Sequence, residues 1–244
     1  MKNTINNGWA YSGVWIAVAA LLCVSVDNAN GQLLGELKKL GFGKDKGKSS
    51  KVDKGAFGDT LNDVLGKVTS ARIAFIDSQI KLHEALGLKT KATTKLSEAK
   101  RALEGASSDP GKKVKALKDS TKTSESANKE LKKAMNSSGE LSADSKKIFV
   151  IGAGKFVEGV VLEKEQIETI KTLVDQGKQL TKSASPFDKL KVIKLIKPVT
   201  ALATLVPGDV KEGVTTLKSI TAFAKKQNVK LGSQEKTDNL LGDL

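Results

Sequence analysis

A glycine-rich stretch in the middle of the chain raises the question of a nucleotide-binding loop. Residues 146–165 are KKIFVIGAGKFVEGVVLEKE. The dinucleotide-binding fingerprint places three glycines as G-x-G-x-x-G between a strand and a helix. Gly152 and Gly154 fit the first two positions, but Val157 occupies the third, where a glycine lets the helix pack closely on the strand. The spacing therefore disfavours a cofactor loop.

Helical spacing explains the same stretch better. Apolar side chains recur every three or four residues, and this pattern predicts one broad helical stripe. Its members are Ile148, Ile151, Phe156, Val160, Ile167, Ile170, Val174 and Leu180. On such a helix Gly152 and Gly159 would be small contact points that let a second helix approach closely. We therefore predict a helix here and no bound cofactor.

Other catalytic arrangements find little support in the sequence. His83 is the only histidine, so it cannot form a multi-histidine metal site, and it is expected at the edge of the core or on the surface. The chain contains no G-x-S-x-G nucleophile elbow and no acidic spacing typical of a calcium loop. Glu163 and Glu165 would point to different faces of a helix. We therefore predict a protein that is not an enzyme and has no metal site.

The first residues of the chain have the pattern of a secretory signal. Residues 14–26 (VWIAVAALLCVSV) form an uncharged apolar run. Such a run is shorter than the roughly 20 residues of a membrane span but fits the apolar region of a signal peptide. Ala29 and Gly31 supply small residues at positions −3 and −1 of a cut. We predict a signal peptide over residues 1–31 and a secreted or periplasmic location; an N-terminal anchor helix that stays in place is the alternative.

Cys23 is the only cysteine and lies inside the apolar run. A lipoprotein signal also ends in a cysteine, but it requires a small residue before it, and Leu22 stands there. Lipidation is therefore the less favoured alternative. Cleavage after Gly31 would leave a chain without cysteine, and hence without disulfides or thiolate metal ligands.

The formal net charge of +14 comes almost entirely from lysine, since Arg72 and Arg101 are the only arginines. Arginine supplies the bidentate fork that recognises guanine edges. The stacking residues Trp9, Tyr11 and Trp15 all fall within the signal segment. The composition therefore disfavours sequence-specific nucleic-acid recognition, while attraction to anionic surfaces stays open.

A segment rich in glycine and lysine follows the signal. Residues 32–58 are predicted to be a flexible cationic linker. This linker is either a solvated spacer or a tether to acidic lipid or an anionic cell-wall polymer. The lysines that would make such a contact are Lys44, Lys46, Lys48, Lys51 and Lys54.

Helical periodicity dominates residues 59–228, and no stretch alternates with a sustained period of two. We therefore predict an all-α fold, an antiparallel bundle of about five or six helices behind an N-terminal signal segment. The tail, residues 229–244, is polar and expected to be loose. The expected helices cover residues 60–87, 89–104, 112–135, 144–185, 187–206 and 210–224.

Two of these helices carry unusual patterns. The helix over residues 112–135 has a coiled-coil-like seam whose middle is polar, so weak packing is expected. The seam consists of Val114, Leu117, Thr121, Ser124, Asn128, Leu131 and Met135. The helix over residues 187–206 is expected to have a kink or break at Pro198 and a turn at 207–209 after it. Its apolar side chains at helical spacing are Phe187, Leu190, Ile193, Ile196, Leu202 and Leu205.

These features predict an exported, non-enzymatic helical binding or scaffold protein of the cell envelope. The expected partner is an envelope protein, an anionic polymer or a lipid surface; nothing in the pattern specifies the ligand or the oligomeric state. The alternative is a membrane-active bundle that binds lipid through lysines or forms pores. Residues 148–162 and 192–206 motivate it, because both are apolar and nearly free of acidic residues. However, Lys155 and Glu158 interrupt the first segment and Lys194 and Lys197 the second, and each segment is shorter than a span.

Overall fold

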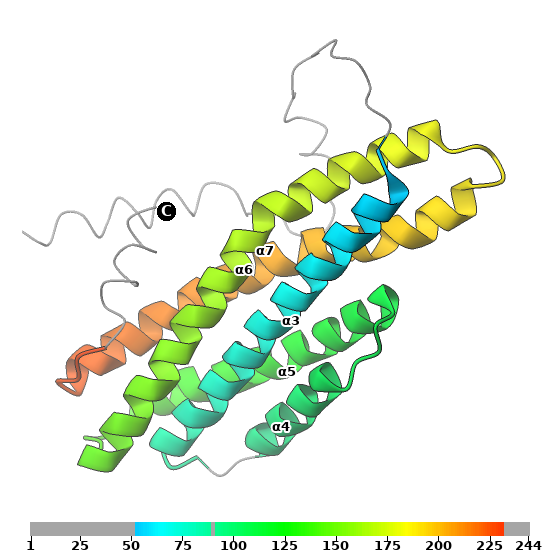
Figure 1. Cartoon of the computed structure of the whole chain (residues 1–244). Helices are drawn as coiled ribbons and strands as arrows, with labels where there is room; N and C mark the ends of the chain where they lie inside the picture. Colours follow the sequence, from blue (N-terminus) through cyan, green and yellow to red (C-terminus); the bar gives the residue numbers. More distant parts are fainter. Residues whose placement is uncertain (1–51, 89–90, 232–244) are drawn as a thin grey trace, which may run out of the picture. The chain divides into compact units, whose positions relative to one another are not determined.

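The computed structural model describes residues 52–88 and 91–231, and this part of the chain consists of five α-helices (Figure 1). They are α3 (Lys54–Ala85), α4 (Lys91–Glu104), α5 (Pro110–Ser137), α6 (Ala143–Ser183) and α7 (Lys189–Lys226). No strand occurs in these two ranges, so the predicted all-α class is confirmed. The signal segment and most of the predicted linker and tail lie outside the described residues.

Successive helices run in opposite directions along the bundle (Figure 1). Helix α3 packs on α6 and α5, and α7 packs on the same two helices from the other side. These four helices therefore form a ring around a common core. Helix α4 is shorter and lies on α3 and α5, so α3 has neighbours on three sides. That position explains the wide apolar stripe of α3.

Side-chain caps define where the helices begin. The Asp53 carboxylate accepts a hydrogen bond from the Ala56 amide at 2.9 Å, Asp109 caps α5 ahead of Pro110, and Ser142 caps α6. Each cap satisfies an amide that has no partner within the first turn. Helix α3 therefore starts at Lys54, earlier than the predicted start at residue 60.

This early start corrects the predicted boundary of the linker. Residues 54–58 belong to the first turns of α3 rather than to a flexible segment. Phe57 is only 1% exposed and lies in the core. An apolar side chain there stabilises the helix end through tertiary packing, a contribution that a Gly- and Lys-rich composition hides.

Large apolar side chains from every helix fill the interior. The largest fully buried ones are Phe57, Phe149, Phe156, Leu61, Leu65, Ile76, Leu82, Leu96, Leu117, Leu131, Leu173 and Leu202. Two aromatic pairs add to the contacts between helices: Phe75 with Phe156, and Phe149 with Phe223. The apolar stripe of residues 146–165 thus belongs to α6, and the predicted helix in this stretch is confirmed.

Helix α7 differs from the prediction because it is continuous. Pro198 and Pro207 both lie inside it, and no turn forms at residues 207–209. A proline removes one backbone hydrogen bond from a helix interior. Here Val199, Leu202 and Val206 are buried between or beside the prolines, so packing on the bundle holds both halves of the helix in line.

The start of α7 also buries a different face from the one predicted. Phe187, just before the helix, is 94% exposed, and Leu190 and Ile193 are 72% and 52% exposed. Val192 and Val199 are buried instead. The rotation of α7 follows from its contacts with α5 and α6, because both alternatives satisfy helical periodicity.

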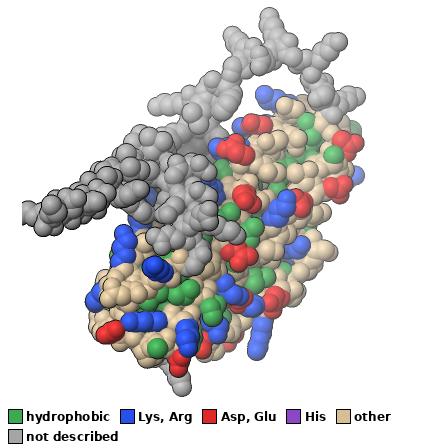
Figure 2. Space-filling view, turned by 60° about the vertical axis from the view of Figure 1, so that its left-hand side comes forward, with side chains coloured by type: hydrophobic (Ala, Val, Ile, Leu, Met, Phe, Trp, Pro, Cys, Tyr) green, Lys and Arg blue, Asp and Glu red, His purple; other side chains and the backbone are tan. Residues whose placement is uncertain are grey.

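Over most of one face the surface is mixed in charge. Figure 2 shows basic and acidic side chains interspersed there, with apolar ones between them. Exposed lysines of the described residues form short-range ion pairs, such as Lys171 with Glu168 at 2.7 Å and Lys178 with Asp175 at 2.8 Å. Exposed pairs of this kind stabilise a protein little, so this mixture describes a solvated surface.

Candidate functional site

Three charged side chains meet inside the ring of helices. The Nη2 atom of Arg72 on α3 contacts Asp209 on α7 and lies 3.1 Å from Oε1 of Glu163 on α6. Thr121 of α5 donates a hydrogen bond to Asp209 Oδ2 at 3.3 Å. All four side chains are buried. We refer to Arg72, Glu163, Asp209 and Thr121 as the buried cluster, to which each helix of the ring contributes one residue.

Glycines bring the helices close together at the buried cluster. A Cβ atom on Gly159 would lie 3.1 Å from the Phe75 ring, and one on Gly213 would lie 3.0 Å from Val160 Cγ2. Both distances are tighter than ordinary van der Waals contact. Each glycine is one helical turn from a carboxylate of the cluster, which places both carboxylates within reach of Arg72.

The cluster contains two carboxyl groups and one guanidinium group. Burial raises the pKa of Glu163 to about 6, although the neighbouring Arg72 favours its charged form. Within the described residues Oε2 of Glu163 has no hydrogen-bond partner. An ionised carboxylate without full solvation is unfavourable in the interior. Glu163 therefore exchanges its proton closer to neutral pH than an exposed glutamate does.

A second polar layer lies beside the buried cluster. Gln79 Nε2 donates to Asn128 Oδ1 at 2.8 Å and to the Ser124 carbonyl oxygen at 2.9 Å. A cavity of about 20 Å³ lies between this layer and the cluster, which is room for one water. The polar middle of the α5 seam therefore has partners on α3 and α7, and the seam is buried.

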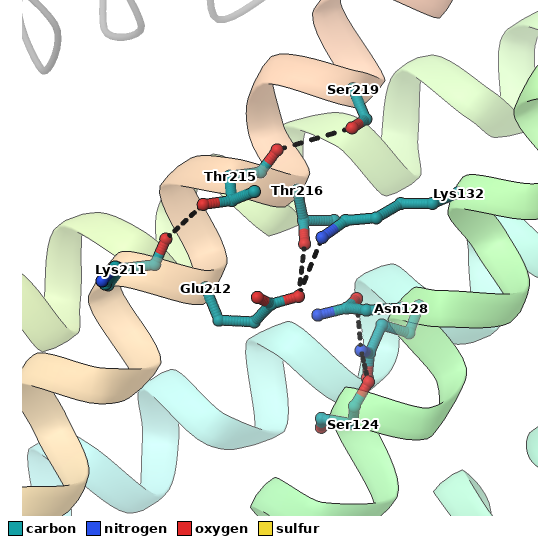
Figure 3. A network of polar contacts seen from close by, with 9 residues as sticks. Ser124, Asn128, Lys132, Lys211, Glu212, Thr215, Thr216 and Ser219 are labelled. Atoms are coloured by element: carbon teal, nitrogen blue, oxygen red, sulfur yellow. Dashed lines mark hydrogen bonds and ion pairs between the residues drawn. The ribbon is translucent and has the colours of Figure 1, made fainter. Parts of the chain in front are cut away.

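At the border of the core, α5 and α7 are joined by an ion pair (Figure 3). Lys132 Nζ lies 2.9 Å from Glu212 Oε1, and Thr216 donates to the same oxygen at 3.3 Å. The lysine is 27% exposed and the glutamate 40%. This half-exposed pair connects two helices. Glu212 also lines a shallow open pocket of about 300 Å³, whose other lining residues are Glu125, Lys129, Gly208, Lys211 and Thr215.

His83 is fully buried, whereas the sequence placed it at the edge of the core or on the surface. Its Nδ1 lies 2.7 Å from the Gln79 carbonyl oxygen, and Nε2 is 3.9 Å from Glu130. Burial lowers the pKa of His83 more than these neighbours raise it. The described part of the chain holds no group of three or more His, Cys, Asp or Glu that could bind a metal ion.

The end of the bundle where α6 connects to α7 has a different surface. Phe187, Leu190 and Ile193 follow each other at three-residue spacing and are all exposed. We call these three residues the apolar ridge. Contiguous exposed apolar side chains on a well-packed protein mark sites of interaction.

An open groove of about 590 Å³ continues from the apolar ridge. It is lined by Lys118 of α5, Thr181 of α6 and Ile193, Ile196, Lys197, Thr200, Ala201, Thr204 and Leu205 of α7. The lining contains lysine and hydroxyl groups around an apolar floor and includes no carboxylate or imidazole. These side chains can hold an apolar or anionic group, but they provide no general acid–base pair.

The residues singled out from the sequence lie in different places. Gly159 lies at the buried cluster, and a Cβ on Gly152 would be 3.0 Å from Leu82 Cγ. Lys54 lies at the start of α3, 3.9 Å from Asp188 beside the apolar ridge. Lys44, Lys46, Lys48 and Lys51 lie outside the described residues.

The sequence did not predict the buried cluster or the exposure of the apolar ridge. Residue type alone does not distinguish Glu163 and Asp209 from acidic residues on the surface. Only the apolar neighbours of Glu163 on its helical face indicated that it is buried. Arg72 offered a clearer signal, since a single arginine within an apolar stripe is unusual in a chain that otherwise uses lysine. The apolar ridge was assigned to the core because its spacing is helical.

Comparison with protein-family models, with curated proteins and with solved structures finds no match for this chain. In the described ranges no helix has the length and apolar character needed to cross a membrane. The protein is therefore defined by its fold, as an all-α helical bundle with a buried charged cluster and an exposed apolar ridge.

Proposed function

We propose that this protein is an exported, non-enzymatic binding protein of the cell envelope, and that it binds through the α6–α7 end of the bundle. Export rests on the signal pattern of residues 1–31. The observation that carries the proposal is the exposure of the apolar ridge in a bundle whose other large apolar side chains are mostly buried. Exposed apolar side chains in one row gain free energy when a partner covers them.

The buried cluster and the groove beside the apolar ridge both favour binding over catalysis. The buried cluster is enclosed by four helices and its adjoining cavity has room for one water only, so a substrate has no access to its carboxyl groups. The larger groove has access but lacks acid–base residues among those that line it. A protein that binds a partner on its surface needs neither an accessible carboxyl group nor an acid–base pair, so both observations fit this function.

Surface binding is favoured over the pore-forming alternative. The two apolar segments that motivated pore formation supply core side chains, including Phe149, Phe156, Val199 and Leu202, which are fully buried. Insertion of these segments would require the bundle to open and lose that packing. Binding through the α6–α7 end leaves the core intact.

Affinity capture tests the proposal. The chain and its triple variant Phe187→Ser, Leu190→Ser, Ile193→Ser are immobilised and exposed to envelope and extracellular fractions of the producing cells. We expect a component that the unchanged chain retains and the triple variant loses by about tenfold or more, because three exposed apolar contacts are removed. The control is Ile151→Ser, which removes an apolar side chain that is 53% exposed elsewhere on α6.

Retention of the same components by all three proteins would contradict the proposal. Equal loss with Ile151→Ser would contradict the placement of the binding surface at the α6–α7 end. Circular dichroism checks that each variant keeps the helical content of the unchanged chain.

A further inference from the structure

The charges around the apolar ridge are all of one sign along α7. Lys189, Lys191, Lys194 and Lys197 are exposed and alternate with the ridge along the helix. Residues 189–206 contain no aspartate or glutamate. This half of α7 therefore lacks the acidic side chains that pair with lysines elsewhere on the surface, such as Glu168 and Asp175. It combines exposed apolar side chains with a local excess of positive charge.

The one acidic residue at the start of α7 is already engaged. Asp188 accepts a hydrogen bond from Ser185 at 2.9 Å and lies 3.9 Å from Lys54. This ion pair also shows that the chain enters the bundle at the same end (Figure 1). This carboxylate thus neutralises part of the charge of Lys54, and beyond it no acidic residue stands beside the α7 lysines over residues 189–206.

We propose that the α6–α7 end docks on a lipid bilayer that contains anionic lipids. The apolar ridge enters the interface between head groups and acyl chains, and the lysines of α7 contact the lipid phosphates. This inference rests on the proposed function and names the partner of that surface. Peripheral binding through apolar side chains flanked by lysines needs no membrane-spanning helix.

The ridge and the lysines fit a bilayer because the apolar side chains and the charged groups can contact the lipid interface at the same depth. Lysine side chains carry a charged end on an apolar stem, so they reach phosphates while their stems lie beside the ridge. Each lysine near an anionic surface strengthens binding by about fivefold. Salt weakens this attraction, since the screening length is about 10 Å at 0.1 M ionic strength.

A second copy of the chain fits the ridge less well. In a symmetric dimer the same surface would face itself. The lysines of α7 would then oppose those of the partner copy, and opposed like charges disfavour an interface. An anionic surface reverses the sign of this interaction.

Vesicle flotation tests the inference with the chain from Gln32, the form expected after signal cleavage, which contains every described residue of the bundle. The vesicles are phosphatidylcholine alone or phosphatidylcholine with phosphatidylglycerol. We expect binding only to the anionic vesicles and weaker binding in about 1 M salt than in about 0.1 M salt.

Two variants locate the contact. The triple variant Phe187→Ser, Leu190→Ser, Ile193→Ser should lose at least about tenfold in affinity, because the ridge no longer has apolar groups to bury. Changing Lys189, Lys191, Lys194 and Lys197 to Gln should weaken binding by about fivefold for each lysine. The matched control changes Lys211, Lys218, Lys225 and Lys226, on the other half of the same helix, to Gln and should lose far less.

A tryptophan reporter measures the depth of the ridge directly. Both tryptophans of the sequence lie at positions 9 and 15, so Phe187→Trp in the chain from Gln32 carries a single one. Its fluorescence should shift to shorter wavelength when anionic vesicles are added. Ile151→Trp, exposed on α6, is the control and should not shift.

The results distinguish a failure of the lipid partner from a failure of binding at the α6–α7 end. No flotation with anionic vesicles, or equal loss in the control lysine variant, overturns the lipid inference. If ridge-dependent capture of a protein persists in the affinity experiment, the binding function stands without a bilayer. Loss of both signals overturns both.

Discussion

Glu163 is a buried glutamate that shares its arginine with a second carboxylate. Arg72 faces Glu163 and Asp209 at once, so neither carboxylate has a cation of its own. Burial accordingly raises the pKa of Glu163 to about 6. A group with this property makes the stability of the folded chain depend on pH.

The direction of that dependence follows from proton linkage. Because folded Glu163 holds its proton more tightly than an ordinary glutamate of pKa 4.5, its contribution to stability is complete below about pH 4.5. The contribution is lost as the pH rises through about 6, and it amounts to about 2 kcal/mol. Glu163→Gln has no carboxyl group at this position and should not lose this contribution. The difference in unfolding free energy, variant minus unchanged chain, should therefore increase by about 2 kcal/mol between pH 4.5 and pH 7.

Urea unfolding at a series of pH values measures this difference. Glu165→Gln is the matched control, because Glu165 is exposed on the same helix. Its stability should follow that of the unchanged chain at every pH. Burial lowers the pKa of His83, but this histidine is present in all three proteins, so the comparison removes its effect. A constant difference between Glu163→Gln and the unchanged chain across the range would contradict the role assigned to Glu163.

At the scale of the helices, close approach depends on small residues. Gly159 of α6 faces Phe75 and the Ala71 carbonyl oxygen of α3, where an added Cβ would lie 3.1 Å and 3.2 Å from them. Gly154, on the same helix, has no neighbour within 4 Å of such a Cβ. Two glycines of one helix thus differ only in what they face.

This difference predicts opposite outcomes for the same substitution. Gly154→Ala should stabilise the protein by about 0.5–1 kcal/mol, because alanine favours the helix over glycine. Gly159→Ala gains the same propensity but crowds a backbone oxygen and a buried ring. We expect it to be less stable than Gly154→Ala by about 1–3 kcal/mol.

Thermal or urea unfolding of both variants gives this comparison. Equal stability of the two alanine variants would show that α3 and α6 separate freely at this point. In that case the buried cluster would not depend on close helix approach.

At the scale of the whole molecule, the described helices lie within one compact unit. Residues 51–234 form this unit, and α7 closes the ring by supplying Leu202, Val206 and the Asp209 partner of Arg72. Because four helices contribute to this one core, removal of any of them exposes the apolar side chains of the other three.

We therefore expect the fragment of residues 51–234 to fold by itself. Its circular dichroism should be mainly helical, and its melting temperature should lie within a few degrees of that of the chain from Gln32. The control fragment, residues 51–188, lacks α7 and should show no cooperative transition, because Arg72 loses one carboxylate and the core loses one side. A cooperative transition in the shorter fragment would contradict the four-helix ring.

Much of the fold followed from local pattern. The apolar spacing predicted the helices, and the all-α class is confirmed because a period of 3.6 residues excludes strands over long segments. The glycine stretch of residues 146–165 belongs to a helix for the same reason. The signal peptide and most of the cationic linker remain predictions, since they lie outside the described residues.

Helix ends and helix rotation were less predictable. The first turns of α3 depend on the burial of Phe57, and the continuity of α7 through Pro198 and Pro207 depends on packing at both sides. The apolar ridge was predicted to be core because Phe187, Leu190 and Ile193 have helical spacing. Spacing specifies that residues share a face, but the neighbouring helices decide which face is covered.

The sequence by itself determined the helical class, the breaks near Gly87, Pro110, Gly139 and Pro186 and the excess of lysine, because each of these depends on local residue pattern or composition. Only the tertiary structure brought Arg72, Glu163 and Asp209 together from three helices, and only it left the apolar ridge uncovered. Both features depend on how the helices are rotated against each other. That rotation arises from packing between residues far apart in the chain, which no local pattern contains.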